Sequence, residues 1–171
     1  MVYSPATTLV KARLVPAIGE RPTVQPIEFQ FNPSQLNFER SVEVNNNVEG
    51  NTRTASLLKK VSFAGPNPIK ISIDNIIYDT FETGQSVMEV YINKIVAGLD
   101  FNAYDWYARV RRPPLYSFVW GDRQRYLRRC FIESVSYQLT LFLPSGTPVR
   151  AKVSLKLQQL EDQSIGAPKQ N

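Results

Sequence analysis

Over most of the chain, apolar and polar residues alternate one by one, and this pattern is the strongest constraint on the fold. Successive side chains of a β-strand point to opposite faces, so a period of two predicts strands with one buried face. We therefore expect about eight strands in a mainly β (α+β) architecture. The expected strands cover residues 7–15, 27–31, 38–48, 57–63, 69–78, 115–120, 126–140 and 149–157.

A single segment has a different period. Between Gln85 and Leu99, apolar residues recur at helical spacing, and Gly84 and Gly98 fit its two boundaries. This predicts one helix that lies with one face on a sheet. We expect a mainly antiparallel sheet system that is closed or packed on itself, with this α-helix covering one opening or flank. Residues 1–160 are expected to form one domain, followed by a polar tail at 161–171.

The length and composition suit such a domain. The chain has 171 residues, of which 43% are hydrophobic. A domain of this size buries roughly 70% of the surface that its unfolded chain exposes. The core is therefore expected to be stable without a disulfide or a structural metal.

Two residue counts exclude most enzyme classes. The chain has no histidine and only one cysteine, Cys130, so it cannot build a Ser-His-Asp or Cys-His centre or a Cys-His zinc site. It also lacks the glycine-rich motifs that hold phosphates. Catalysis by carboxylates or lysines alone remains open, but the paired acidic side chains are expected to be solvated or to cap a helix. We predict no catalytic residue, cofactor or metal, and expect Cys130 to be a buried free thiol.

Neither the first residues nor the hydropathy of the chain indicates a membrane segment. The first residues have neither a basic region nor an apolar run, and no apolar run approaches 18 residues. We therefore expect neither a secretory signal nor a membrane span.

The positive charge is concentrated in one segment. Residues 109–129 carry net +6, against a total of +5, so the rest of the chain is close to neutral. Aromatic residues such as Trp106, Tyr116, Phe118 and Trp120 lie among these cations, which would suit phosphate contacts and base stacking. The arginines are Arg109, Arg111, Arg112, Arg123, Arg125, Arg128 and Arg129.

Two other interpretations compete with nucleic-acid binding. The alternation of Tyr116, Phe118 and Trp120 favours aromatic side chains that point into the core, and arginine is common at protein interfaces. The segment is then a basic patch that faces a protein partner or a lumen, or simply solvated charge. We favour the protein-facing patch and keep a nucleic-acid-binding β-domain as the alternative.

A long hairpin is predicted between residues 42 and 63, with a polar tip rich in asparagine. It is either a surface loop or an arm that pairs with a neighbouring chain. The residues of this candidate subunit or ring interface are Val42, Val44, Asn46, Glu49, Asn51, Arg53, Leu57, Lys59 and Lys60.

Several short motifs occur in a recognisable order. They are Phe-Asn-Pro at 31–33, Phe-Ala-Gly-Pro at 63–66, Tyr-Asp-Thr at 78–80, Arg-Pro-Pro at 112–114, Phe-Val-Trp-Gly at 118–121, and Leu-Phe-Leu-Pro-Ser-Gly-Thr-Pro-Val-Arg-Ala at 141–151. Over residues 8–160, this order resembles the N-terminal domain of the contractile injection system tube-initiator or baseplate adaptor family of phage-tail-like particles. The motif residues with an expected structural role are Asn32, Pro33, Gly65, Trp120, Gly121, Pro144, Gly146, Pro148 and Arg150.

The resemblance implies a tail-tube-like fold, a β-barrel or sandwich with one flanking α-helix, and a structural function. It implies a homo-hexameric ring around a channel, assembled in the cytoplasm and placed in the baseplate between a trimeric spike or hub protein and the inner tube protein. Other baseplate proteins are possible partners, and no small-molecule substrate is implied. The segment 42–60 would be the arm that reaches a neighbouring subunit or ring. Many members carry a LysM-type domain after this one, for which a chain ending at Asn171 has no room.

Overall fold

The structure, a computed structural model, describes residues 9–45, 62–101, 103–105, 110–121 and 125–160. About half of the described residues are in strands, as expected for a mainly β protein. The strands are β1 (Arg13–Pro16), β2 (Ile27–Glu28), β3 (Asn37–Glu39), β4 (Val42–Asn45), β5 (Ser62–Pro66), β6 (Lys70–Asp79), β7 (Ala103–Asp105), β8 (Val110–Arg112), β9 (Tyr116–Val119), β10 (Arg125–Phe142) and β11 (Pro148–Gln159).

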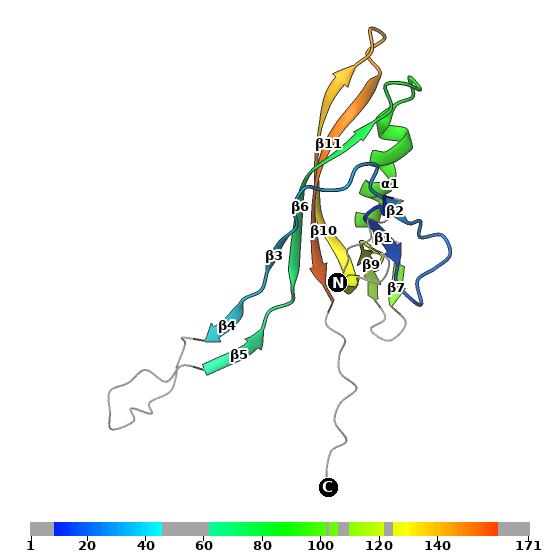
Figure 1. The fold of residues 1–171 in the computed structure, drawn as a ribbon. Helices are drawn as coiled ribbons and strands as arrows, with labels where there is room; N and C mark the ends of the chain where they lie inside the picture. The colour runs from blue at the N-terminus through cyan, green and yellow to red at the C-terminus, as the bar shows by residue number, and fades with distance from the viewer. Residues whose placement is uncertain (1–8, 46–61, 102, 106–109, 122–124, 161–171) are drawn as a thin grey trace, which may run out of the picture.

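One antiparallel sheet organises the described residues. Its seven strands have the order β2-β1-β9-β10-β11-β6-β3, while β4–β5 and β7–β8 form separate two-stranded ribbons (Figure 1). The long strand β10 connects the two parts of the sheet. It pairs with β9 up to Cys130 and with β11 from Cys130 to Phe142, so Cys130 lies opposite both Tyr116 and Gln159.

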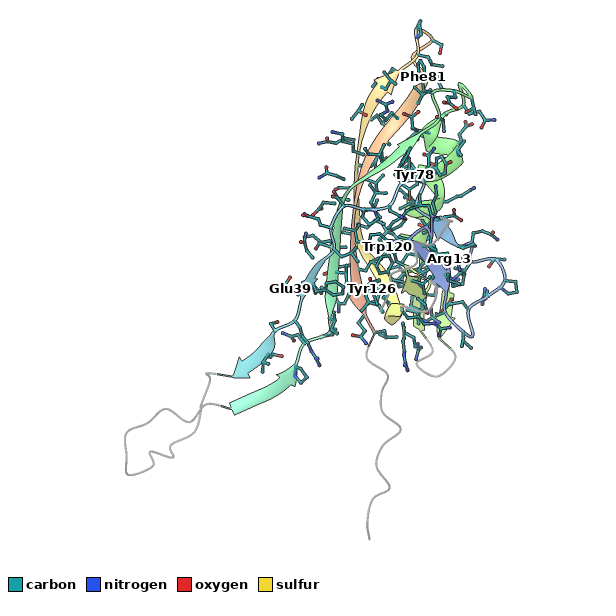
Figure 2. The ribbon with its side chains drawn as sticks, in the orientation of Figure 1. Arg13, Glu39, Tyr78, Phe81, Trp120 and Tyr126 are labelled. Atoms are coloured by element: carbon teal, nitrogen blue, oxygen red, sulfur yellow. The ribbon has the colours of Figure 1, made fainter. Side chains whose placement is uncertain are left out.

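The helix covers the apolar face of this sheet. It runs from Met88 to Leu99 as a π-helical turn (Met88–Ile92), an α-helical turn α1 (Asn93–Val96) and a 3-10 turn (Ala97–Leu99). Its Ile92 and Ile95 are buried against the sheet core. Figure 2 shows Tyr78 between β6 and the helix, where its ring lies 4.9 Å from that of Tyr91.

Two side-chain amides fasten the segment after β2. The Gln30 amide accepts from the Asp79 backbone N–H at 2.7 Å and donates to the Asp79 carbonyl at 2.9 Å. The Asn32 amide binds the segment before β1 in the same way: it accepts from the Ala12 backbone N–H and donates to the Val10 carbonyl, both at 2.9 Å. These side chains take the place of strand partners, so they hold this segment against two backbone edges.

The structure corrects four details of the expected architecture. The sheet is open, so the barrel alternative is wrong in its closed form. The described residues form eleven strands instead of about eight, partly because the expected strand 38–48 breaks at Arg40–Ser41 into β3 and β4. Gly65 and Pro66, whose residue types predict a turn, lie in β5. The helix is confirmed, but only four of its residues are α-helical.

Candidate assembly surfaces

A two-stranded ribbon projects from the body of the protein. The chain leaves the sheet through β3, continues into β4, and returns through β5 into β6 (Figure 1). At the root of the ribbon, Asn67 donates to Ser41 twice, from its backbone N–H to the carbonyl and from its amide to Oγ, each at 2.8 Å. This clasp fixes the two chains where the ribbon departs from the sheet.

The ribbon confirms the two sides of the predicted hairpin. Val42 lies opposite Pro66 and Val44 opposite Phe63 in an antiparallel pairing. Val42 exposes 54% of its surface, so its apolar side chain finds little cover in its own chain. Seven candidate interface residues lie outside the described residues and stay predictions: Asn46, Glu49, Asn51, Arg53, Leu57, Lys59 and Lys60.

The basic segment is distributed over several elements. Arg111 is exposed at β8, and Arg125 and Arg128 are exposed on the first part of β10, where Arg129 is half-buried. Arg109 and Arg123 lie outside the described residues. The part of β10 that carries three of these arginines therefore remains a candidate charged surface.

Arg112 has a different environment, which the sequence pattern did not indicate. Its guanidinium lies 2.6 Å from the carboxylate of Glu20, and the Glu20 side chain is only 3% exposed. The pair joins the β1–β2 loop to the segment before β9, which is a structural contact within one chain. No local signal connects residues 92 positions apart, so only the folded chain reveals this partner.

Within the described residues, the aromatic side chains among these arginines are mostly internal, and Trp106 lies outside those residues. Tyr116 and Phe118 are buried, and Trp120 packs partly buried against the core. The Phe118 ring contacts Phe29 at 6.1 Å and Tyr126 at 5.7 Å. Side chains committed to the core leave little aromatic surface for base stacking in this part of the chain.

Most motif residues shape turns and connections. Asn32 makes the two bonds described above, and Pro33 beside it is buried. Gly121, which follows Trp120 at the end of β9, has φ of 95°. That conformation is costly for residues with a Cβ, which explains the Trp-Gly order. Gly65 also has a positive φ, in strand β5.

The longest motif forms the β10–β11 turn and the first residues of β11. Leu143 N–H donates to the Thr147 carbonyl at 2.9 Å, and Gly146 N–H donates to the Leu143 carbonyl at 2.8 Å. Gly146 has φ of 84°, Pro144 is exposed, and Pro148 begins β11. The motif therefore encodes a tight turn at the tip of a long hairpin.

Arg150 connects this hairpin to β6. Its guanidinium lies 2.5 Å from the carboxylate of Asp79, the residue directly opposite in β6. The pKa of Asp79 is lowered, mainly because its carboxylate accepts from the Phe81 backbone N–H and also because Arg150 is adjacent. The carboxylate is therefore ionised at neutral pH and ties together the ends of two strands and a loop.

These surfaces offer little for catalysis. Burial raises the pKa of Cys130 to about 12, and its thiol donates to the Tyr116 carbonyl at 3.3 Å, so it stays protonated at neutral pH. An open hollow of about 470 Å³ lies beside Asp79, between the exposed rings of Phe31 and Phe81. Within the described ranges, no cluster of three or more His, Cys, Asp or Glu side chains suits a metal ion.

No helix within the described part of the chain has the length and apolar character required to cross a membrane. A comparison with curated proteins gives no match. Residues 11–167 match the family model described as contractile injection system tube protein. Because this match covers nearly the whole chain and the structure is a mainly antiparallel β fold with one helix, the chain belongs to the contractile injection system tube protein family.

Proposed function

We propose that this protein forms a hexameric ring in the baseplate of a phage-tail-like particle, joins a trimeric spike to the inner tube, and initiates tube assembly. Membership of the tube protein family makes the protein a structural, non-enzymatic component of a contractile injection system. The baseplate position is the more specific part of the proposal. It is supported by the resemblance of the ordered motifs to the tube-initiator and adaptor proteins.

The observation that carries the assembly function is the projecting ribbon. Strands β4 and β5 pair with each other and not with the seven-stranded sheet. A two-stranded ribbon alone is marginally stable in water, and its edges are ready to pair with another chain. An arm of this kind suits a subunit whose neighbours supply the missing contacts.

The number of copies per particle tests the baseplate position. An adaptor ring predicts about six copies for every three spike chains, whereas a tube-body protein predicts many stacked rings and a much larger ratio. Quantitative mass spectrometry of purified particles measures this ratio directly. A cryo-EM reconstruction should then show this chain in one six-fold layer beside the spike.

Deleting the gene gives a second, independent test. An initiator predicts that spikes and baseplate parts accumulate without attached tubes, while tube protein remains soluble. Reintroducing the full chain should restore the tubes. Tubes of normal length on spikes that lack this chain, or a copy ratio well above that of one ring, would contradict the proposal.

A further inference from the structure

The open hollow of about 470 Å³ lies at the end of the molecule that carries the β10–β11 turn. Its walls come from the chain after β2, the residues that follow β6, the π-helical turn and Arg150 of β11. Figure 2 shows Phe81 at this end, far from Tyr126. Pockets of roughly 300–1,000 Å³ accommodate drug-sized ligands, so a long side chain with its adjoining backbone fits this hollow.

Two aromatic side chains line the hollow and are half exposed. Phe31 exposes 51% of its surface and Phe81 exposes 54%. Apolar residues that are exposed singly need no explanation, but two large rings on one concave surface are typical of a binding site. Their exposed surface is therefore available to a partner.

Hydrogen bonds hold the walls of the hollow in place. The hydroxyl of Thr80, which is 6% exposed, donates to the Gln85 carbonyl at 2.6 Å, and the Thr80 carbonyl accepts from the Gly84 N–H at 2.9 Å. The Phe81 N–H donates to the Asp79 carboxylate at 2.8 Å. A site that is already formed before binding loses less conformational entropy when a ligand arrives.

The charges around the hollow favour a cationic ligand. Asp79 and Glu82 contribute two carboxylates and Arg150 contributes one guanidinium, so the lining carries one net negative charge. The hydrogen bond from the Phe81 N–H is the main cause of the lowered pKa of Asp79, so this carboxylate is ionised at neutral pH. Aromatic rings attract cations, and arginine is the commonest partner because its planar guanidinium is weakly hydrated.

We infer that this hollow is a docking site for a basic segment of another protein of the particle. An arginine or lysine side chain of that segment lies against Phe31 and Phe81 and directs its charge toward the carboxylate of Glu82. The inference rests on the proposed function for the kind of partner, because an adaptor must hold proteins other than itself.

The exposed arginines at the start of β10 cannot fill the hollow of their own copy. Arg128 lies near the first end of β10, whereas Leu141, near its other end, lies opposite Arg150 of the hollow. At about 3.3 Å per residue, these two positions on β10 are roughly 40 Å apart. The cation therefore has to come from a different chain.

Saturation-transfer NMR with a defined peptide tests the chemistry of the site. The probe is the acetylated and amidated peptide Gly-Arg-Gly. Its matched control carries citrulline, in which a neutral urea group of nearly the same shape replaces the guanidinium. Because the signals are observed on the peptide, the full chain is measured equally well as a single subunit or as a ring.

Three variants of the protein locate the binding. Phe81→Leu removes one ring and Glu82→Gln removes one charge. Phe101→Leu is the control, because Phe101 exposes 61% of its surface and is not among the described residues that line the hollow. All three replace exposed side chains, and circular dichroism verifies that they fold.

We expect the arginine peptide to bind about two- to fivefold more tightly than the citrulline peptide. Phe81→Leu and Glu82→Gln should each weaken its binding by a similar factor, while Phe101→Leu leaves it unchanged. Equal binding of the two peptides, or equal binding to Phe81→Leu and Phe101→Leu, would overturn the proposed chemistry of the hollow.

Photo-cross-linking in assembled particles identifies the partner. The photoreactive p-benzoylphenylalanine replaces Phe81 in one full-length variant and Phe101 in the control, and mass spectrometry maps the products. We expect position 81 to cross-link to a different protein, within a few residues of an arginine or lysine. Cross-links only to other copies of this chain, or no product beyond that of the control, would overturn the assignment of the partner.

These outcomes are separable from those of the proposed function. A six-fold layer beside the spike, together with equal binding of the two peptides, would refute the docking site and leave the ring intact. Conversely, the expected cross-link together with a copy ratio far above one ring would keep the docking site and reject the baseplate position.

Discussion

Substitution of Gly98 by alanine tests how tightly the helix packs on β10. A Cβ at this position would lie 2.6 Å from Cδ1 of Ile132 and 3.4 Å from the Tyr116 hydroxyl. Carbon atoms prefer a separation of about 3.5–4.0 Å, so the overlap with Cδ1 is about 1 Å. Ile132 is 1% exposed and cannot move aside into solvent.

The expected cost combines two opposing effects. Overpacking of a filled core typically costs about 1–3 kcal/mol. Alanine recovers up to about 1 kcal/mol because it is a better helix former than glycine. We therefore expect a net loss of roughly 1–2 kcal/mol in the free energy of unfolding, or about 2–8 °C in Tm for a chain of this length.

Ile132→Val provides a matched partner because it removes the clashing Cδ1. Alone it should cost about 0.5–1.5 kcal/mol. In the double variant the new Cβ occupies the vacated space, so Gly98→Ala should cost little or nothing on that background. Urea unfolding at 25 °C, followed by tryptophan fluorescence, measures all three variants. A Gly98→Ala protein as stable as wild type, or strictly additive costs, would refute this account of the packing.

Three further substitutions are expected to change the stability of the fold by different amounts. Glu20→Gln should lower the free energy of unfolding by about 1–3 kcal/mol, because it removes the carboxylate that pairs with Arg112 at a mostly buried site. Glu133→Gln, in an exposed pair, should lower it by less than about 1 kcal/mol. Equal losses in urea unfolding would contradict the difference in burial. Asn32→Ala should lower the free energy of unfolding by about 1–3 kcal/mol because two hydrogen bonds are lost. Unchanged stability would show that these two hydrogen bonds are dispensable. The Cys130 thiol stays neutral when folded but ionises near pH 9 when unfolded, so its contribution is complete below pH 9 and falls as pH rises toward 12. Between pH 9 and 10, wild type should therefore lose about 1 kcal/mol more stability than Cys130→Ala, and parallel pH profiles would contradict the buried thiol.

The local elements were predictable because alternation and helical spacing are local properties. Strand β11 and the helix follow the pattern that their residues predict, and β6 alternates except near Asn75. There the backbone adopts a positive φ of 58° and shifts the alternation, so Ile76 is buried and Ile77 is half-exposed. A polar residue inside an apolar run is the signal that was available for this irregularity.

The order and closure of the sheet were not predictable in the same way. Whether strands close into a barrel depends on which edges pair, and several strands with good alternation are compatible with either outcome. The Glu20–Arg112 pair shows the same limit for the basic segment, because arginine composition alone does not distinguish an intrachain partner from an interface. The resemblance of the ordered motifs supplied the family, which the alternation pattern alone does not identify.

The pairing of β1 with β9 has a consequence for the timing of folding. Leu14 lies opposite Ile27 of β2 on one side and Phe118 of β9 on the other, so the β9 side of β1 stays unpaired until most of the chain has been made. At ~5–20 residues per second, synthesis of the intervening chain takes roughly 5–20 s. The β10–β11 hairpin is local and needs no such wait, although it is synthesised last. The β10–β11 hairpin therefore joins the sheet only after β9, the distant partner of β1, has been made.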